Sequence, residues 1–182
     1  MIPKIILCFL QKLILKIVNW KNSKPTYGYY KREIKLIVQI GIDRIDEIVE
    51  FEKLCFSHDA WSKEQIIDVL NDKRTIYLCY EENEKIIGLI GLYNWCSEKD
   101  FLKIFSIATH PEHRNQGIAH ELLKESIKIA SSNELKRIKA ETRKSNFKMQ
   151  KVFEDMNFKK TDIVENYYEE PDEDALIYEF HL

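Results

Sequence analysis

The 182-residue sequence predicts a single domain of the α/β (α+β) class, and three observations support this fold class. A chain of this length can bury about 70% of its unfolded surface in one core, which leaves no material for a second domain. Short runs rich in β-branched and aromatic residues alternate with longer runs whose apolar residues recur at helical spacing. The runs follow the order β-α-α-β-β-β-α-β-α-β-β, so strands and helices are mixed along the whole domain.

The most informative stretch covers residues 101–130. Phe101 to Ala108 is almost wholly apolar, as in a strand covered on both faces, and Pro111 ends it. From Gly117 onward, apolar residues at helical spacing predict a helix with one buried face. A helix start carries unpaired N–H groups and partial positive charge, so the loop 114–119 could bind phosphate oxygens. Taken alone, an ordinary loop that precedes a helix explains the same residues as well.

Local signals predict the other elements. Asp43 caps a helix with an apolar stripe that has Glu52 on its border, and Ser62 with Gln65 forms a capping box for a second helix, 63–70. The polar stretch 81–84 predicts a hairpin between two strands. A helix over 146–156 carries Phe147 on its apolar side. The predicted strands are 34–40, 75–80, 85–93, 101–108, 137–142, 158–163 and 175–181.

The charge distribution separates the first 32 residues from the rest. Of the 28 Lys and Arg residues, seven lie up to Arg32, where there is no Asp or Glu; the other 21 accompany all 30 acidic residues. The acidic body, 33–182, is not expected to bind nucleic acid. We expect residues 1–20 to be a basic amphipathic helix that does not span a membrane. The open alternatives are that it lies on an anionic membrane surface, that it docks on the body or on a partner, or that it is a stray extension. Residues 22–31 are a linker.

The cysteines and histidines predict no metal site and no disulfide. Cys8, Cys55, Cys79 and Cys96 lie far apart in mostly apolar surroundings, which indicates buried, reduced thiols and a cytoplasmic location. Three histidines lie at positions 110, 113 and 120, but no carboxylate or thiol at suitable spacing completes a metal-binding set.

Four motifs together resemble those of the GNAT acyltransferases, and in particular the RimI-type branch, which acetylates the N-terminal alanine of a ribosomal protein. The first is the strand, Pro111 and R-x-x-G-x-A of residues 114–119, which resembles the acetyl-CoA signature. The segment 140–146, AETRKSN, resembles "EVRxSN", and 60–62, AWS, resembles "PWS". Asn166-Tyr167-Tyr168 and Glu173-Asp174-Ala175 match "NYY" and "EDA". The resemblance covers about residues 36–180.

The resemblance implies a mixed, mostly antiparallel sheet that splays at its one parallel strand pair, with helices on both faces and acetyl-CoA bound in the splay. It implies Glu141 as the general base, acting through water. Trp61, Tyr167 and Tyr168 would form the acceptor wall, although a role for Trp61 in packing on its own helix is equally open. The residues implied to bind acetyl-CoA are Ile107, Ala108, Thr109, Arg114, Asn115, Gln116, Gly117, Ile118, Ala119, His120 and Asn146; Asn146 also suits a helix cap.

One departure from the family pattern concerns the proton donor. The family places a tyrosine twelve residues after the glutamate, where this chain has Phe153. A thiolate is a tolerable leaving group, so its absence is expected to lower the rate about 10²-fold or less. We expect an N-acetyltransferase for a protein N-terminal amine, and the alternatives are acetylation of a small amine and a catalytically silent acyl-CoA-binding module.

Overall fold

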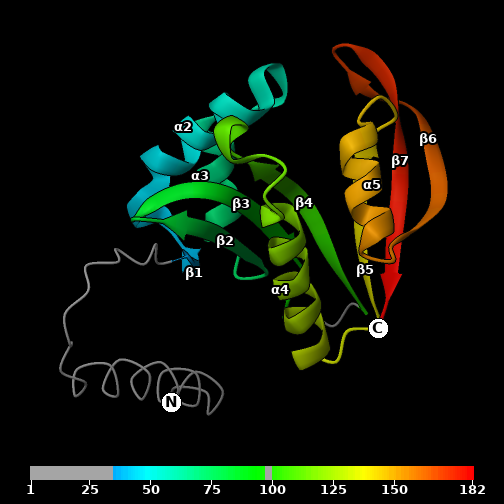
Figure 1. Ribbon diagram of the computed structural model, residues 1–182, viewed down its shortest axis with the longest axis horizontal. Coiled ribbons are helices and arrows are strands. Elements are labelled where there is room, and N and C mark those ends of the chain that lie inside the picture. Colours follow the sequence, from blue (N-terminus) through cyan, green and yellow to red (C-terminus); the bar gives the residue numbers. More distant parts are fainter. Residues whose placement is uncertain (1–34, 97–99) are drawn as a thin grey trace. The chain divides into compact units, whose positions relative to one another are not determined.

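A computed structural model of the chain describes residues 35–96 and 100–182. The basic extension 1–32 that the sequence sets apart, together with Cys8, lies outside the described residues. Within the described part, a seven-stranded sheet has the strand order β1-β2-β3-β4-β5-β7-β6 (Figure 1). The strands are β1 (Lys35–Ile40), β2 (Thr75–Glu82), β3 (Lys85–Tyr93), β4 (Phe101–Thr109), β5 (Arg137–Arg143), β6 (Lys159–Glu169) and β7 (Asp172–His181).

Helices cover both faces of this sheet, and each face has its own apolar core. Helices α2 (Ile45–Phe56) and α3 (Lys63–Asn71) pack on one face, where Ile48, Phe51 and Ile66 are buried. Helix α4 (Ile118–Ser132) and helix α5 (Phe147–Asp155) supply the core on the other face. The α/β class, the order of the elements and the two-sided covering that the sequence predicts are therefore confirmed.

The parallel strands β4 and β5 separate part of the way along the sheet. All other neighbouring strands in the described sheet are antiparallel, and the parallel pairing links only Phe101–Ile104 with Arg137–Ala140. Beyond Ile104 and Ala140 the two strands diverge, as Figure 1 shows. Strand β4 stays paired with β3 as far as Thr109. Its β5-facing edge therefore has no ladder partner in the described sheet from Phe105 onward.

An irregularity in β4 lies at the same point. Ile104 pairs with Leu92 of β3 and Ser106 with Gly91, so Phe105 is an extra residue. A bulge of this kind re-aims the side chains that follow it. The Phe105 ring packs over Gly91, where a Cβ would overlap it, and the small residue is needed for that reason.

Several local predictions are wrong in detail. Asp43 does not cap a helix: it lies in a 3-10 turn, Ile42–Arg44, and Arg44 precedes the first residue of α2. Glu52 is not on the border of the apolar stripe, because it is fully buried. Phe147, expected on the apolar side of its helix, is 74% exposed. Of the three described cysteines, which were expected to be buried, Cys79 is buried, Cys55 is half-buried and Cys96 is exposed; all three are free thiols.

Three strands are longer than the sequence predicts by two residues or more; one is β7, which begins at Asp172 rather than at residue 175. Strand β2 continues through Glu81 and Glu82, so the hairpin turn consists only of Asn83 and Glu84, both with positive φ. Strand β6 extends to Glu169 although almost all of it is exposed, since pairing with β7 rather than burial maintains it. The capping box of Ser62 and Gln65 is present as predicted.

Candidate active site

A cavity of about 570 Å³ lies where β4 and β5 separate. Its walls come from α2, the segment after α2, the two diverging strands, the start of α5 and the end of β6. The residues that line it include Glu52, Asp59, Trp61, Lys103, Phe105, Ser106, Glu141, Arg143, Asn146, Tyr167 and Tyr168. The separation of two strands therefore creates a hollow that is lined by several ionisable groups.

Glu141 stands at the first position of β5 beyond the paired region. Its neighbour Ala140 is the last residue paired with β4, so Glu141 faces the opening between the strands. The Lys103 ammonium lies 2.7 Å from Oε1 of Glu141, and the Tyr167 hydroxyl donates to the same oxygen at 3.1 Å. Burial and the nearby Glu141 carboxylate raise the pKa of Tyr167 above its usual value, so this hydroxyl keeps its proton near neutral pH.

Tyr167 reaches Glu141 because β6 is irregular at this point. Val164 pairs with Ala175 and Tyr168 with Glu173, so three residues of β6 stand opposite the single residue Asp174. Asn166 takes a positive φ of 51°, a conformation that Asn tolerates better than most residues, and its amide donates to Oδ1 of Asp174 at 3.2 Å. This turn of the backbone directs the next side chain toward the cavity.

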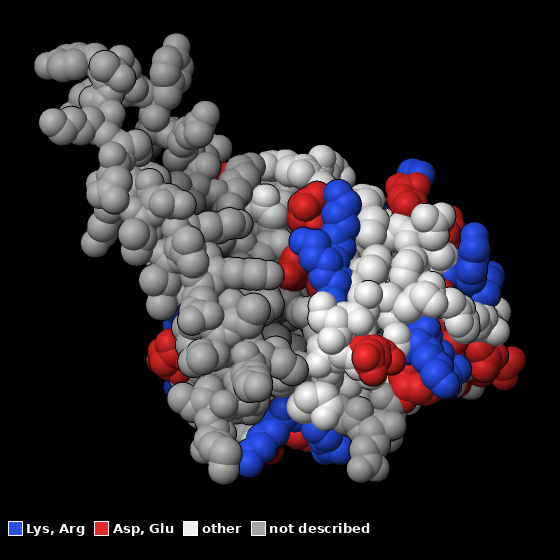
Figure 2. All heavy atoms as spheres, turned by 90° about the horizontal axis from the view of Figure 1, so that it is seen from below, with Lys and Arg blue, Asp and Glu red and all other residues white. Residues whose placement is uncertain are grey.

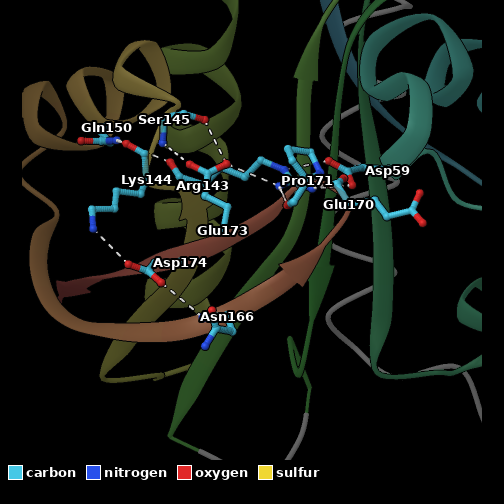
Figure 3. Close-up of polar contacts among 10 residues, drawn as sticks. All are labelled: Asp59, Arg143, Lys144, Ser145, Gln150, Asn166, Glu170, Pro171, Glu173 and Asp174. Carbon is cyan, nitrogen blue, oxygen red and sulfur yellow. Dashed lines mark hydrogen bonds and ion pairs between the residues drawn. The ribbon is translucent and has the colours of Figure 1, made fainter.

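The Arg143 side chain links the segment after α2 to the β6–β7 hairpin at the edge of the opening (Figure 3). Its guanidinium contacts Asp59 at 2.8 and 3.0 Å and donates to the carbonyl oxygens of Glu170 and Pro171, each at 3.0 Å. It also lies 3.4 Å from Glu173 and stacks over the Tyr168 ring at 4.1 Å. The planar fork of arginine suits such a set of acceptors, so this one side chain ties the β6–β7 hairpin to the segment after α2.

The neighbouring residues complete this network. Glu173 accepts hydrogen bonds from the amide and the hydroxyl of Ser145, and Lys144 lies 3.0 Å from Asp174. Figure 3 shows Lys144 and Asn166 reaching Asp174 from opposite sides. The segments 140–146, 166–168 and 173–175, which are far apart in the sequence, thus hold one another in place.

Glu52 is the fully buried carboxyl group of the cavity wall. The Ser106 hydroxyl donates to its Oε1 at 2.9 Å. Burial raises the pKa of Glu52 to about 7, and the hydrogen bond from Ser106 and the nearby amide of Trp61 oppose this shift only in part. Burial also raises the pKa of Tyr77, which faces Glu52 from β2.

The start of α4 offers unpaired backbone N–H groups. Gly117 precedes the helix with φ +81°, no side chain caps the first turn, and a Cβ at Gly117 would meet no atom within 4 Å. Arg114, Asn115 and Gln116 are exposed beside it. An uncapped helix start of this kind suits an anion, and binding of phosphate oxygens there stays a prediction. Nε2 of His120, in the first turn of α4, lies 3.9 Å from Oδ2 of Asp155 on α5.

The structure places the other predicted residues as follows. Ile107, Ala108 and Thr109 lie on the part of β4 that β5 has left. Asn146 caps α5 by accepting the Met149 amide at 3.1 Å and also lines the cavity, so both predicted roles remain open to it. Trp61 packs on Phe105, with ring centroids 5.3 Å apart, and lines the cavity.

Phe153 lies outside the residues that line the cavity. Its ring is 0% exposed and packs between Phe158 and Tyr178, at centroid distances of 5.3 and 5.1 Å. Phe153 therefore contributes to the core of the α5 face. Tyr167 is the tyrosine whose hydroxyl contacts the Glu141 carboxylate.

Sequence reasoning missed Lys103, Asp59 and Ser106 as site residues and placed Glu52 only on a helix border. The available signals were weak. Lys103 and Ser106 are the polar positions in an otherwise apolar strand, and Glu52 is an acidic residue on an apolar stripe. Such positions are candidates for buried polar contacts, but their partners come from elements that only the fold brings together.

The surface of the described part carries mixed charge. On the face seen in Figure 2, basic and acidic side chains lie beside one another.

Among the residues described, no group of three or more His, Cys, Asp or Glu side chains could hold a metal ion. No helix in the described ranges is long and apolar enough to cross a membrane.

Replacing Arg143 by Gln should loosen the β6–β7 hairpin. The change leaves Asp59 and Glu173 without their cation, and we expect a loss of about 2 kcal/mol in the free energy of unfolding. Amide hydrogen exchange in β6 and β7 should become faster. The matched control is Lys144→Gln, whose side chain is 60% exposed and which should change the stability by about 0.5 kcal/mol or less. Equal exchange in both variants would contradict the bracing role of Arg143.

Replacing Glu52 by Gln should change how stability depends on pH. In the folded protein the pKa of Glu52 is about 7, above the ordinary 4.5, so ionisation opposes folding as the pH rises from about 4.5 through 7. The wild type should lose up to about 3 kcal/mol relative to Glu52→Gln between pH 4.5 and 8. Urea unfolding at both pH values measures this difference. Glu50 is exposed, so Glu50→Gln should show the same pH dependence of the free energy of unfolding as the wild type. If Glu52→Gln also showed the wild-type pH dependence, the Glu52 carboxyl group of the wild type would have to be solvated.

Comparisons with known proteins agree with this geometry. A curated relative, the ribosomal protein bS18-alanine N-acetyltransferase of Haemophilus ducreyi, is 29% identical in an alignment 154 residues long that covers 82% of this chain and 99% of the relative. The crystal structure of the Escherichia coli ribosomal-protein-S18-alanine N-acetyltransferase matches with a TM-score of 0.73 and 21% identity, over 81% of this chain and 94% of that one. Arabidopsis thaliana NAA60 in complex with acetyl-CoA matches with a TM-score of 0.72 and 13% identity, over 82% and 100%.

The family model described as the acetyltransferase (GNAT) family matches residues 43–158, which include the diverging strands, the start of α4 and Glu141. The family uses acetyl-CoA as co-substrate. The chain belongs to the GNAT family of acetyltransferases and is an acyltransferase.

Proposed function

We propose that this protein transfers the acetyl group of acetyl-CoA to the α-amine of a protein N-terminus, as its ribosomal-protein-alanine acetyltransferase relative does. The observation that carries the proposal is the position of Glu141, at the point where β4 and β5 part, with the Tyr167 hydroxyl 3.1 Å from it. A carboxylate and a hydroxyl face one hollow between the strands. This hollow has room for both an amine and a thioester.

The described residues fit acetyl-CoA in two places. The uncapped start of α4, with Arg114 beside it, suits the phosphates, and a Cβ at Gly117 would fill the space they need. The open edge of β4 supplies main-chain N–H donors for the pantetheine arm and the thioester oxygen at Ile107 and Thr109, whereas the N–H of Ala108 between them points toward β3. When bound, acetyl-CoA supplies an activated acetyl group as a thioester.

Residues of this chain would then accept and donate the protons of the reaction. Glu141 accepts a proton from the amine through water, which is a modest demand because a peptide α-amine has a pKa of about 7.7 to 8.0. Tyr167 keeps its proton near neutral pH and offers the hydroxyl that Phe153 lacks. Trp61 and Tyr168 form the acceptor wall, and Arg143 holds that wall in place. Free thiols at Cys55, Cys79 and Cys96 suit the cytoplasm.

The test is a thiol-release assay with acetyl-CoA, run on peptides with different first residues and on small amines such as polyamines, with mass spectrometry of the products. Release with peptides and acetylation of their α-amine would support the proposal. Release only with small amines would favour the alternative that the protein acetylates a small amine. Acetyl-CoA binding without release on any acceptor would indicate a silent binding module and contradict the proposal.

Glu141→Gln should lower kcat about 10²-fold and leave the Kd for acetyl-CoA unchanged, because the amide accepts no proton and lies away from the phosphate site. The matched control is Glu179→Gln, which removes a similar ion pair, with Lys139 at 2.9 Å, outside the lining residues. Steady-state kinetics and calorimetric titration measure both quantities. An unchanged kcat in Glu141→Gln would remove this residue from proton transfer.

Gly117→Ala should weaken acetyl-CoA binding about tenfold. The residue has φ +81°, which disfavours a Cβ, and the added methyl group would occupy the anion site. Gly41→Ala is the control, since Gly41 has φ −133° and lies before the 3-10 turn that precedes α2. Calorimetric titration gives both Kd values, and equal values would place the phosphates elsewhere.

A further inference from the structure

The mechanism above leaves one buried acid of the cavity unused. Glu52 projects from the middle of α2, is fully buried, and accepts the Ser106 hydroxyl at 2.9 Å. Its second oxygen, Oε2, is buried and makes no hydrogen bond to another described residue. Burying a carboxyl group in this way opposes folding, so a contribution to stability does not explain its presence.

The irregularity in β4 brings Ser106 to this carboxyl group. Ile104 packs in the core on the α4 side, whereas Phe105 packs with Trp61 and Tyr77 on the α2 side. Regular alternation would return Ser106 to the α4 side. The extra residue instead leaves Ser106 on the α2 side, where it contacts Glu52.

Ser106 also lies beside the place assigned to the reaction. Strands β4 and β5 part directly after Ile104 and Ala140, so Phe105 and Glu141 are the first residues of the opening. Ser106 is the next residue along β4, adjacent to the main-chain groups of Ile107 that are proposed to hold the thioester. Ser106 and Glu52 line the same cavity as Glu141.

The carboxyl groups of Glu52 and Glu141 differ in the charges that surround them. The Lys103 ammonium, 2.7 Å away, neutralises Glu141. No Lys or Arg within the described ranges forms an ion pair with Glu52, whose pKa is raised to about 7, the range that suits proton exchange at neutral pH.

The other ionisable groups around Glu52 do not supply a charge for it. Tyr77 on β2 and Cys55 on α2 stay neutral near pH 7, because burial raises the pKa of each. On the remaining cavity walls, Asp59 is paired with Arg143, and Lys103 with Glu141.

We propose that Ser106 and Glu52 form a second proton-accepting pair for the acceptor amine, in which Ser106 contacts the amine and Glu52 receives the proton through it. This inference rests on the proposed acetyl transfer. As the amine nitrogen bonds to the thioester carbon, its proton passes to Ser106 Oγ, and the Ser106 proton passes to Glu52 Oε1. The carbonyl then re-forms as the carbon–sulfur bond breaks, and the sulfur leaves with the electron pair as thiolate.

The experiment measures kcat against pH, with saturating acetyl-CoA and an accepted peptide, for the wild type, Glu52→Gln and Ser106→Ala. The wild type should lose activity below a midpoint near pH 7, where Glu52 becomes protonated. Both variants should have kcat reduced at least about tenfold at pH 7.5 and should lack this midpoint. The double variant should be no slower than either single variant, because the two groups act as one unit.

Glu50→Gln, on an exposed position of the same helix, is the matched control and should keep the wild-type rate and midpoint. A wild-type pH profile in both Glu52→Gln and Ser106→Ala would overturn this inference while leaving the acetyl transfer intact. Additive losses in the double variant would also overturn it, because they would mean independent structural effects. No transfer by the wild type to any amine would instead overturn the proposed function and, with it, this inference.

Discussion

The early loss of pairing between β4 and β5 is the constraint on which the rest of the structure depends. A parallel pair inside a sheet normally satisfies its main-chain groups along its whole length. Here the pairing ends after four residues on each strand. The unpaired edge that results is unfavourable unless a ligand or water satisfies it, which is the condition that a binding site for an extended substrate requires.

The separated strands need braces, because the β4–β5 ladder no longer joins the two halves of the sheet there. Arg143 supplies one brace by contacting the segment after α2 and the β6–β7 hairpin at once. The Lys103–Glu141 pair supplies another, since its partners stand on the two diverging strands. Glu141 is therefore held across the opening by a charge from the opposite strand, and its position is fixed before any substrate arrives.

Local signals in the sequence predicted the order of the elements, whereas the splayed sheet with helices on both faces was expected from the family resemblance. The apolar run before Pro111, the glycine before α4 and the capping box at Ser62 depend on neighbours within a few residues. The site was predicted less completely. Glu141 and the tyrosines were expected through a family resemblance, whereas the contact between Ser106 and Glu52 depends on an extra residue in β4 that no local pattern indicates.

The slip in register within β6 has a consequence beyond the direction of Tyr167. Strand β6 is the outermost strand next to β7, and nearly all of its eleven residues face solvent. A long, regular outer strand would present a template on which another polypeptide could add as a further strand. The three residues opposite Asp174 interrupt that template in the C-terminal half of the strand. The same distortion that aims a tyrosine inward should thus also make the addition of another strand along this border less favourable.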